Sequence, residues 1–293
     1  MVTSQWCCGR GEPVRSFEGA DGQNGTVTEE DAGVATQAQY PTATSVDEFA
    51  HNLATVRSRI ASVAQQAGRD AAEVRLLPVS KTVPEERIRL AVQAGCSELG
   101  ENKVQEAERK YHNLADLDVS WAVIGHLQTN KAKDVAQFAA EFQALDRLRV
   151  AETLDRRLQG IGRSLDVYVQ VNTSAEQSKY GLPPDEVLPF LQQLPQYTAL
   201  RVRGLMTLAV FSSDVEQVRP CFTLLRELRD RARETDPDLL GPGELSMGMS
   251  GDYETAIEEG SNVVRVGQAI FGARALPDSH YWPGGGGAVP AQD

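Results

Sequence analysis

The sequence predicts a single (β/α)8 barrel, and three observations support this fold class. Eight short apolar runs alternate with helical segments between about residues 74 and 266, an alternation typical of a parallel sheet covered by helices. Residues 45–275, about 230 in number, have the composition of a globular domain and the usual size of one barrel. Glycines and unusual polar residues collect where the runs end, as expected of a barrel whose binding loops follow its strands.

Two flanking segments differ in composition from this central part. Residues 1–44 are rich in Gly, Ser, Thr, Gln and acidic residues, so we expect a disordered acidic N-terminal extension. Residues 276–293 contain four consecutive glycines and are expected to form a flexible C-terminal tail.

The first predicted element is an amphipathic helix from about Val46 to Ala67. Ser45 is the expected N-cap, because Glu48 follows it three residues later, as in a capping box. Gly68 ends the helix. One face repeats apolar residues at helical spacing: Phe49, Leu53, Val56, Ile60 and Val63.

The eight apolar runs are the strand candidates. They lie at about residues 74–80, 97–100, 120–124, 141–146, 165–171, 201–207, 244–247 and 262–266. The fifth run, Asp166-Val-Tyr-Val-Gln-Val171, is a strong strand on its own, whereas the second and the seventh are too short to assign alone. The barrel prediction therefore depends on the number and spacing of the runs.

Charge and hydropathy exclude several classes of partner. A net charge of -12 repels nucleic acid and anionic lipid. The longest apolar stretch, Gly204–Phe211, is too short to span a bilayer, and the N-terminus has no signal-peptide pattern. The four cysteines lack metal-ligand spacing. We expect a cytoplasmic protein that binds neither nucleic acid nor membrane.

Lys81 ends the first apolar run, Arg75-Leu-Leu-Pro-Val-Ser-Lys81. Chemistry in a parallel barrel gathers at the carboxyl ends of the strands. An apolar surrounding would lower the pKa of the amine toward the neutral form that makes a Schiff base with an aldehyde. A solvated lysine at a strand end is the alternative interpretation.

The loops after the seventh and eighth runs predict an anion site. Their sequences are Ser246-Met-Gly-Met-Ser250 and Arg265-Val-Gly-Gln268. Small residues before a helix leave backbone N–H groups available to a phosphate, and these two loops often bind phosphate in barrels. Ser250-Gly-Asp252 is also compatible with a simple helix cap, and the two roles do not exclude each other.

A Schiff-base lysine and a phosphate site at one barrel mouth indicate a phosphorylated aldehyde, with pyridoxal 5'-phosphate (PLP) as the leading candidate. Arg265 beside the pyridine nitrogen would keep that nitrogen unprotonated, which weakens the ring as an electron sink. The alternative role for Arg265 is an ion pair with Glu258 or Glu259.

The ordered motifs between about residues 48 and 274 closely resemble those of the pyridoxal phosphate homeostasis proteins. The segments that match are Val79-Ser-Lys81, Gly100-Glu-Asn102, Val104-Gln-Glu106, Ile124-Gly-His-Leu-Gln128, Asn130-Lys131, Gln170-Val-Asn172, Ser178-Lys-Tyr-Gly181, Arg203-Gly-Leu-Met206, Leu245-Ser-Met-Gly-Met-Ser250, Val264-Arg-Val-Gly267 and Ile270-Phe-Gly272.

This resemblance implies a barrel like the N-terminal domain of bacterial alanine racemase, with PLP bound covalently to Lys81 and Arg265 facing the ring nitrogen. It implies phosphate contacts from Ser246, Ser250, Gly267 and Gln268, and a ring lined by Asn102 and Met206. Relatives often have a small hydroxyl residue at the position of Gln268, so a backbone contact is expected there. The long N-terminal extension departs from the family pattern, and a misassigned start codon would explain it.

The expected function is that of a non-catalytic, monomeric PLP carrier. Racemases of this fold need a second domain that supplies a tyrosine and closes the site, and a short glycine-rich tail follows Arg274. The carrier would buffer PLP or deliver it to apo PLP-dependent enzymes, with indirect effects on amino-acid and keto-acid metabolism. His126, Glu101 and Asp146 are the possible catalytic bases.

Two other functions stay open. The first is a PLP-dependent enzyme acting on amino acids like a racemase. The second is a class I type aldolase for a phosphosugar, although the lysine of those barrels usually comes from a later strand. If Lys81 were not the reactive amine, the nearest other candidates would be Lys103, Lys131 and Lys179.

Overall fold

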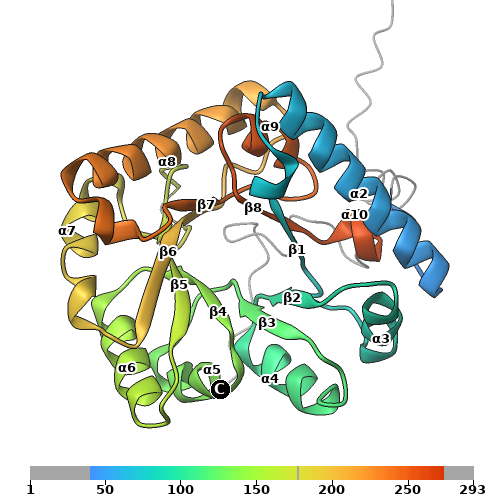
Figure 1. The fold of residues 1–293 in the computed structure, drawn as a ribbon, viewed down its shortest axis with the longest axis horizontal. Helices are drawn as coiled ribbons and strands as arrows, with labels where there is room; N and C mark the ends of the chain where they lie inside the picture. The colour runs from blue at the N-terminus through green and yellow to red at the C-terminus, as the bar shows by residue number, and fades with distance from the viewer. Residues whose placement is uncertain (1–39, 177, 274–293) are drawn as a thin grey trace, which may run out of the picture.

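The computed structural model describes residues 40–176 and 178–273. Within these residues eight parallel strands form one sheet in the order β1-β8-β7-β6-β5-β4-β3-β2. This is the predicted (β/α)8 barrel (Figure 1). The strands are β1 (Arg75–Pro78), β2 (Glu98–Glu101), β3 (Ser120–Val123), β4 (Glu141–Leu145), β5 (Leu165–Val171), β6 (Leu200–Thr207), β7 (Glu244–Ser246) and β8 (Val263–Val266).

The barrel is closed by contacts on both sides of β1. On one side Arg75 to Pro78 pair in register with Val263 to Val266 of β8. On the other side the backbone pairing of β1 with β2 lies beyond the end of β1, in a parallel bridge between Val79 and Gly100 and a 3.0 Å hydrogen bond from Ser80 N to Gly100 O. The residue before Lys81 is therefore part of the barrel closure.

Helices lie around the outside of the strands (Figure 1). The first, α2, begins after Ser45 with the predicted capping box, in which the Ser45 hydroxyl accepts from Glu48 N and the Glu48 carboxylate accepts from Ser45 N. Its apolar face is buried as predicted. The helices are α2 (Val46–Gln66), α3 (Glu85–Gln93), α4 (Val104–Asn113), α5 (Ala132–Phe138), α6 (Leu148–Gln159), α7 (Val187–Leu191), α8 (Val215–Thr235), α9 (Tyr253–Glu258) and α10 (Gln268–Phe271).

Residues 40–44 pack against the barrel, which shortens the predicted disordered extension at its C-terminal end. Ala43 is buried, and its carbonyl accepts a 2.8 Å hydrogen bond from Arg87 Nε. The carbonyl of Tyr40 accepts from Ala273 N at 2.8 Å. Composition does not reveal this packing, because the partners of the segment, Arg87 and Ala273, lie far from it in the sequence. Residues 1–39 and 276–293 lie outside the described residues.

The described part of the chain contains no helix that is both long enough and apolar enough to cross a bilayer.

Candidate functional site

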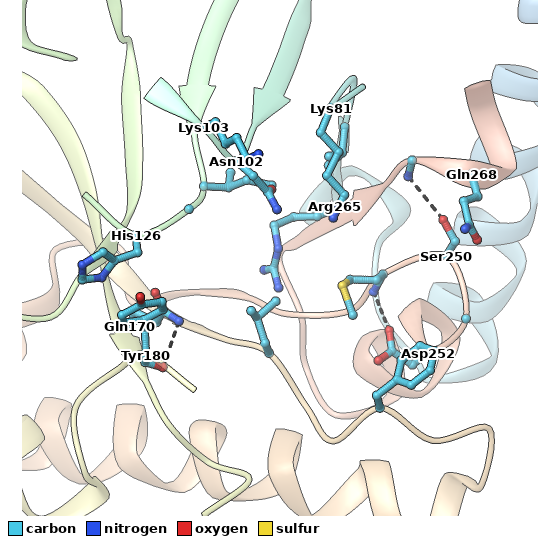
Figure 2. Close-up of a pocket in the computed structure, with 18 of the residues that line it drawn as sticks. Lys81, Asn102, Lys103, His126, Gln170, Tyr180, Ser250, Asp252, Arg265 and Gln268 are labelled. Carbon is cyan, nitrogen blue, oxygen red and sulfur yellow. Dashed lines mark hydrogen bonds between the residues drawn. The ribbon is translucent and has the colours of Figure 1, made fainter. Parts of the chain in front are cut away.

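A cavity of about 730 Å³ opens at the carboxyl ends of the strands. Its wall includes residues that follow seven of the eight strands, so one pocket gathers segments that are far apart in the sequence. Six of the eight predicted site residues line this pocket (Figure 2). They are Lys81, Asn102, Ser250, Arg265, Gly267 and Gln268.

The two peptide groups that flank Lys81 are both held by side chains. Lys110 Nζ donates to the Ser80 carbonyl at 2.8 Å, and Glu106 Oε1 accepts from the Thr82 amide at 2.8 Å. Thr82 has a positive φ of 66°, a conformation that costs free energy for a residue with a β-branched side chain. Lys110 and Glu106 thus hold the backbone on either side of Lys81, which directs the Lys81 side chain into the pocket.

Lys110 is the centre of a buried charge cluster behind Lys81. Its ammonium lies 2.7 Å from Glu101 Oε1 and 2.8 Å from Glu106 Oε1, and its side chain is fully buried. Glu101 also accepts from Ser80 Oγ at 2.6 Å, while burial raises its pKa against the opposing effect of Lys110. Glu101, a possible base in the sequence, is therefore part of the support beneath Lys81.

Arg265 is a buried cation on the pocket wall, and its guanidinium has two fixed contacts. One terminal nitrogen donates to Ser246 Oγ at 2.6 Å and the other to the Thr207 carbonyl at 2.7 Å. Burial lowers the pKa of Arg265 to about 10, so the side chain stays ionised at neutral pH. Figure 2 shows Arg265 between two groups of residues, with Ser250 and Gln268 on one side and His126 and Tyr180 on the other.

The alternative ion pair of Arg265 with a local carboxylate is wrong. Glu258 pairs with Arg219 at 2.6 Å, and Glu259 pairs with Arg219 and Arg226. Both carboxylates belong to α9 and its C-terminal cap, where they bind arginines of α8. They lie on the helical layer of the barrel, whereas the Arg265 guanidinium is inside it.

Met206 and Ser246, the other two predicted site residues, do not line the pocket. Both are fully buried and lie opposite each other in the register of β6 and β7. The Ser246 hydroxyl donates to Gln143 Oε1 at 2.7 Å and accepts from Arg265. A phosphate contact through this hydroxyl therefore has no geometric support, because its single O–H donor is directed to Gln143 inside the barrel.

The loops after β7 and β8 face each other across one end of the pocket. Ser250 Oγ accepts from Gly267 N at 3.2 Å, so it connects the two loops and does not cap α9. A Cβ at Gly267 would lie 3.1 Å from the Val79 carbonyl oxygen, which explains a glycine at this close approach to the end of β1. Asp252, also on the wall, accepts from Met249 N, and burial raises its pKa.

Asn102 is placed by a close backbone contact between the loops after β2 and β3. A Cβ at Gly125 would lie 2.1 Å from the Asn102 carbonyl oxygen. Only glycine permits this approach, because the nearest atoms are backbone and cannot move aside as a flexible side chain would. The contact brings Asn102 to the pocket wall next to Lys103 (Figure 2).

His126 lies at the other end of the pocket, in contact with Tyr180. The two rings stack with centroids 3.8 Å apart, and Arg147 lies 3.2 Å from His126 Nε2. Burial and then the charge of Arg147 lower the pKa of His126, whereas Asp146 opposes the shift. Asp146 itself pairs with Arg147 at 3.0 Å. The structure thus connects both possible bases to Arg147.

The three other candidate amines differ in position. Lys103 and Lys131 line the pocket, and Lys131 Nζ lies 3.6 Å from Asp134 of α5. Lys179 is outside the pocket lining and donates to the Ala209 carbonyl at 2.8 Å. Lys103 and Lys131 are therefore the two lysines, besides Lys81, whose positions allow a Schiff base with a ligand in this pocket.

Comparison with known proteins connects this pocket to a family. Residues 45–275 match the family model of the alanine racemase N-terminal domain. The chain is 42% identical over 227 residues to the pyridoxal phosphate homeostasis protein of Pseudomonas aeruginosa, an alignment that covers 77% of this chain and 96% of that protein. The chain belongs to the pyridoxal phosphate homeostasis family.

Solved structures agree with membership in this family. The structure of PipY from Synechococcus elongatus PCC7942 with PLP bound has a TM-score of 0.69 and 34% identity, and the match covers 76% of this chain and all of PipY. Alanine racemase from Clostridium difficile 630 matches with a TM-score of 0.60 at 15% identity, over 79% of this chain and 58% of the racemase. The second likeness shows a shared barrel fold.

Sequence reasoning missed several residues around the site of this family member. Lys110 gave a detectable signal, since it follows Glu106 by four residues on a helix and so can pair with it. Gln143 gave a weaker one, as a polar residue within the apolar run of β4. Tyr40 and Phe211 line the pocket but lie outside any periodic pattern, so only the tertiary structure reveals them.

Proposed function

We propose that this protein binds PLP covalently through Lys81 and serves the intracellular homeostasis of PLP by holding it and delivering it. The observation that supports this function best is the convergence in one cavity of Lys81, Arg265 and the paired loops at Ser250 and Gly267. Family membership and the PLP-bound structure of PipY support the same ligand.

The residues that line the pocket have distinct roles in this proposal. The Lys81 amine forms the covalent link, and the loops that contain Ser250, Gly267 and Gln268 surround the phosphate, with Gln268 contributing through its backbone. Arg265 faces the ring nitrogen and Asn102 lines the ring. When bound, PLP supplies an aldehyde that bonds reversibly to amines.

Two buried residues act from behind the pocket wall. Met206 is fully buried on β6, one residue before Thr207, whose carbonyl holds Arg265. Ser246 accepts a hydrogen bond from the same guanidinium. We assign both of them to the support of Arg265 rather than to direct contact with the ligand.

Covalent binding is tested by the absorption spectrum of the purified protein incubated with PLP. Wild type should show a visible band that borohydride removes, together with one labelled peptide that contains Lys81. Lys81→Ala should lose both and remain folded, because one side chain at the pocket mouth is removed and the core is unchanged. Lys131→Ala is the matched control, as a lysine of the same pocket. Labelling that persists in Lys81→Ala would contradict the proposal and identify another amine.

The proposal of a carrier rather than an enzyme is supported by the surroundings of the possible bases. Glu101 is engaged with Ser80 and Lys110, and Arg147 contacts both His126 and Asp146. The relatives are named as homeostasis proteins. The alternative is a racemase-like enzyme acting on amino acids.

Transfer and turnover measurements separate these two functions. With PLP bound, the protein should activate an apo PLP-dependent enzyme while its own visible band decays. It should interconvert L- and D-alanine negligibly. Racemisation above about one turnover per second, a rate typical of enzymes, would contradict the carrier function.

We further propose that the protein works in the cytoplasm. Cys96 and Cys221 are buried free thiols, and burial raises the pKa of Cys96 to about 11. Such unpaired and unreactive thiols are common in a reducing compartment.

A further inference from the structure

Arg265 is a buried charge without an ion-pair partner among the described residues. Its exposed fraction is 2%, and within residues 40–176 and 178–273 no carboxylate lies within salt-bridge distance of it. Asp252 and Glu141 favour its charge electrostatically from farther away. Because an uncompensated buried cation is costly, the neutral groups that contact Arg265 have to stabilise it.

One of these contacts begins a chain of hydrogen bonds through the barrel interior. Arg265 donates to Ser246 Oγ at 2.6 Å. Ser246 Oγ donates to Gln143 Oε1 at 2.7 Å, and Gln143 Nε2 donates to Glu141 Oε1 at 2.5 Å. Glu141 is then paired with Arg75 at 2.6 Å. We call these three hydrogen-bonded side chains, Ser246, Gln143 and Glu141, the relay.

The relay crosses the barrel from one end toward the other. Arg75 and Glu141 are the first residues of β1 and β4, at the end of the barrel opposite the pocket. Ser246 is the last residue of β7, and Arg265 is the third of the four residues of β8. Ser246 and Gln143 are fully buried, so bulk water does not replace a missing link.

The direction of every hydrogen bond in the relay is determined by its two ends. A guanidinium can only donate, so Ser246 must accept from Arg265 and turn its own proton toward Gln143. An ionised carboxylate can only accept, so Gln143 must present its amide nitrogen to Glu141 and its carbonyl to Ser246. All the dipoles therefore point the same way, with the carboxylate at one end and the cation at the other. Aligned hydrogen bonds of this kind polarise and strengthen one another.

We propose that Gln143 and Ser246 are positioning residues for Arg265, and that their relay to Glu141 fixes the orientation of the guanidinium and compensates its charge. The consequence for the ligand rests on the proposed function, because it requires a PLP ring whose nitrogen faces Arg265. In the wild type that nitrogen meets a cation held in one orientation. Without the relay, the guanidinium loses this fixed orientation toward the ring nitrogen.

The relay itself is tested in the protein without ligand, by NMR of the arginine guanidinium nitrogens. A guanidinium held by two buried hydrogen bonds should give resolved terminal N–H signals, assigned by their loss in Arg265→Lys. Ser246→Ala and Gln143→Met should remove or broaden these signals. Thr255→Val is the matched control, because it deletes the hydroxyl of a buried residue on α9, outside both the relay and the Thr207 contact. Thermal unfolding shows which variants are folded, and Ser246→Ala, which loses a single oxygen, is the milder variant.

The Gln143→Glu variant tests whether residue 143 acts through its hydrogen bonds or only by filling space in the core. The new carboxyl group would lie against Glu141, and two carboxylates at such a distance share a proton. In its acid form the introduced carboxyl group donates to Glu141 and accepts from Ser246, as the amide does. We therefore expect the Arg265 signals to persist in Gln143→Glu and to be lost in Gln143→Met, although both side chains have a similar length.

The ligand test compares PLP with pyridoxal, which lacks the phosphate. Loss of a hydrogen bond to a charged group should weaken binding of both ligands by the same factor, roughly tenfold or more, in Ser246→Ala and Gln143→Met. Weaker binding of PLP alone would instead make Ser246 a phosphate residue and overturn the proposal. Unchanged Arg265 signals in both variants would overturn it as well. If wild type bound neither ligand, the proposed function would fail, while the NMR result would still decide the relay.

Discussion

Arg265 keeps its charge at neutral pH although burial lowers its pKa to about 10, and this charge should control the reactivity of the bound ring. Replacing a repelling cation with a carboxylate raises the basicity of the ring nitrogen. We therefore expect Arg265→Glu to shift the absorption spectrum of bound PLP and to increase its reactivity with added amino acids. Arg265→Lys retains a cation and is the control. An unchanged spectrum in a folded Arg265→Glu protein would make Arg265 a purely structural residue.

Lys110 should be among the most sensitive positions for stability. Its removal leaves Glu101 buried without its cation, and breaking a buried pair from one side costs about 3–5 kcal/mol. We expect Lys110→Met to lower the free energy of unfolding in urea by about this amount and to slow the labelling of Lys81. The double variant Lys110→Met/Glu101→Gln should recover part of the loss, because it also removes the uncompensated carboxylate. A loss below about 1 kcal/mol in the single variant would mean that water reaches the site.

His126 should make stability depend on pH. Its pKa in the folded protein is lowered from 6.5, mainly by burial and then by Arg147. Below pH 6.5 the unfolded chain binds the proton more readily than the folded one. The His126 contribution to stability is therefore complete above that pH and decreases as the pH falls through the folded-state pKa. Urea unfolding at about pH 7.5 and about pH 5.5 should show a smaller difference in His126→Gln than in wild type, and an equal difference would contradict this assignment.

Among the elements, α2 is the one whose prediction and structure agree most closely. The capping box at Ser45 and Glu48 and the buried apolar face are both present, since they depend on contacts three or four residues apart. Ser45→Ala should lower the free energy of unfolding by about 1 kcal/mol, the usual cost of losing an N-cap. Ser62→Ala, on the same helix, is the control. An equal effect of the two substitutions would show that the cap is not the cause.

The strands show where local reasoning succeeds and where it ends. Long apolar β5 can be recognised by itself, whereas β2 and β7 have only four and three residues and are recognisable only from the spacing of their neighbours. Residues 40–44 have the composition of the expected extension, yet distant partners such as Arg87 and Ala273 bind them. Composition describes what a segment can bury by itself, and it contains no information on hydrogen-bond partners elsewhere in the chain.

At the scale of the whole molecule, we expect a monomer. Among the described residues, the large apolar side chains that are exposed are Ile161, Tyr180, Phe211 and Val215. Tyr180 and Phe211 line the pocket, which leaves little apolar surface for a stable dimer interface. The net charge of -12 also opposes self-association. Light scattering after size-exclusion chromatography should give the mass of one chain, 31.9 kDa, at both low and high salt, and a mass twice as large would contradict the prediction.

The sequence alone determined the barrel, the order of its strands and the presence of Lys81, Arg265 and the glycine-containing loops at one mouth. These features follow from periodicity and from the rule that the carboxyl ends of parallel strands lie together. The tertiary structure decided which of these residues line the pocket. It excluded Met206 and Ser246 from the lining, and it connected Ser246 to Gln143 and Lys110 to the backbone around Lys81. The physical reason is that hydrogen bonds between the strands join residues far apart in the chain, such as Ser246 and Gln143 or Val79 and Val266, and no local pattern in the chain encodes them.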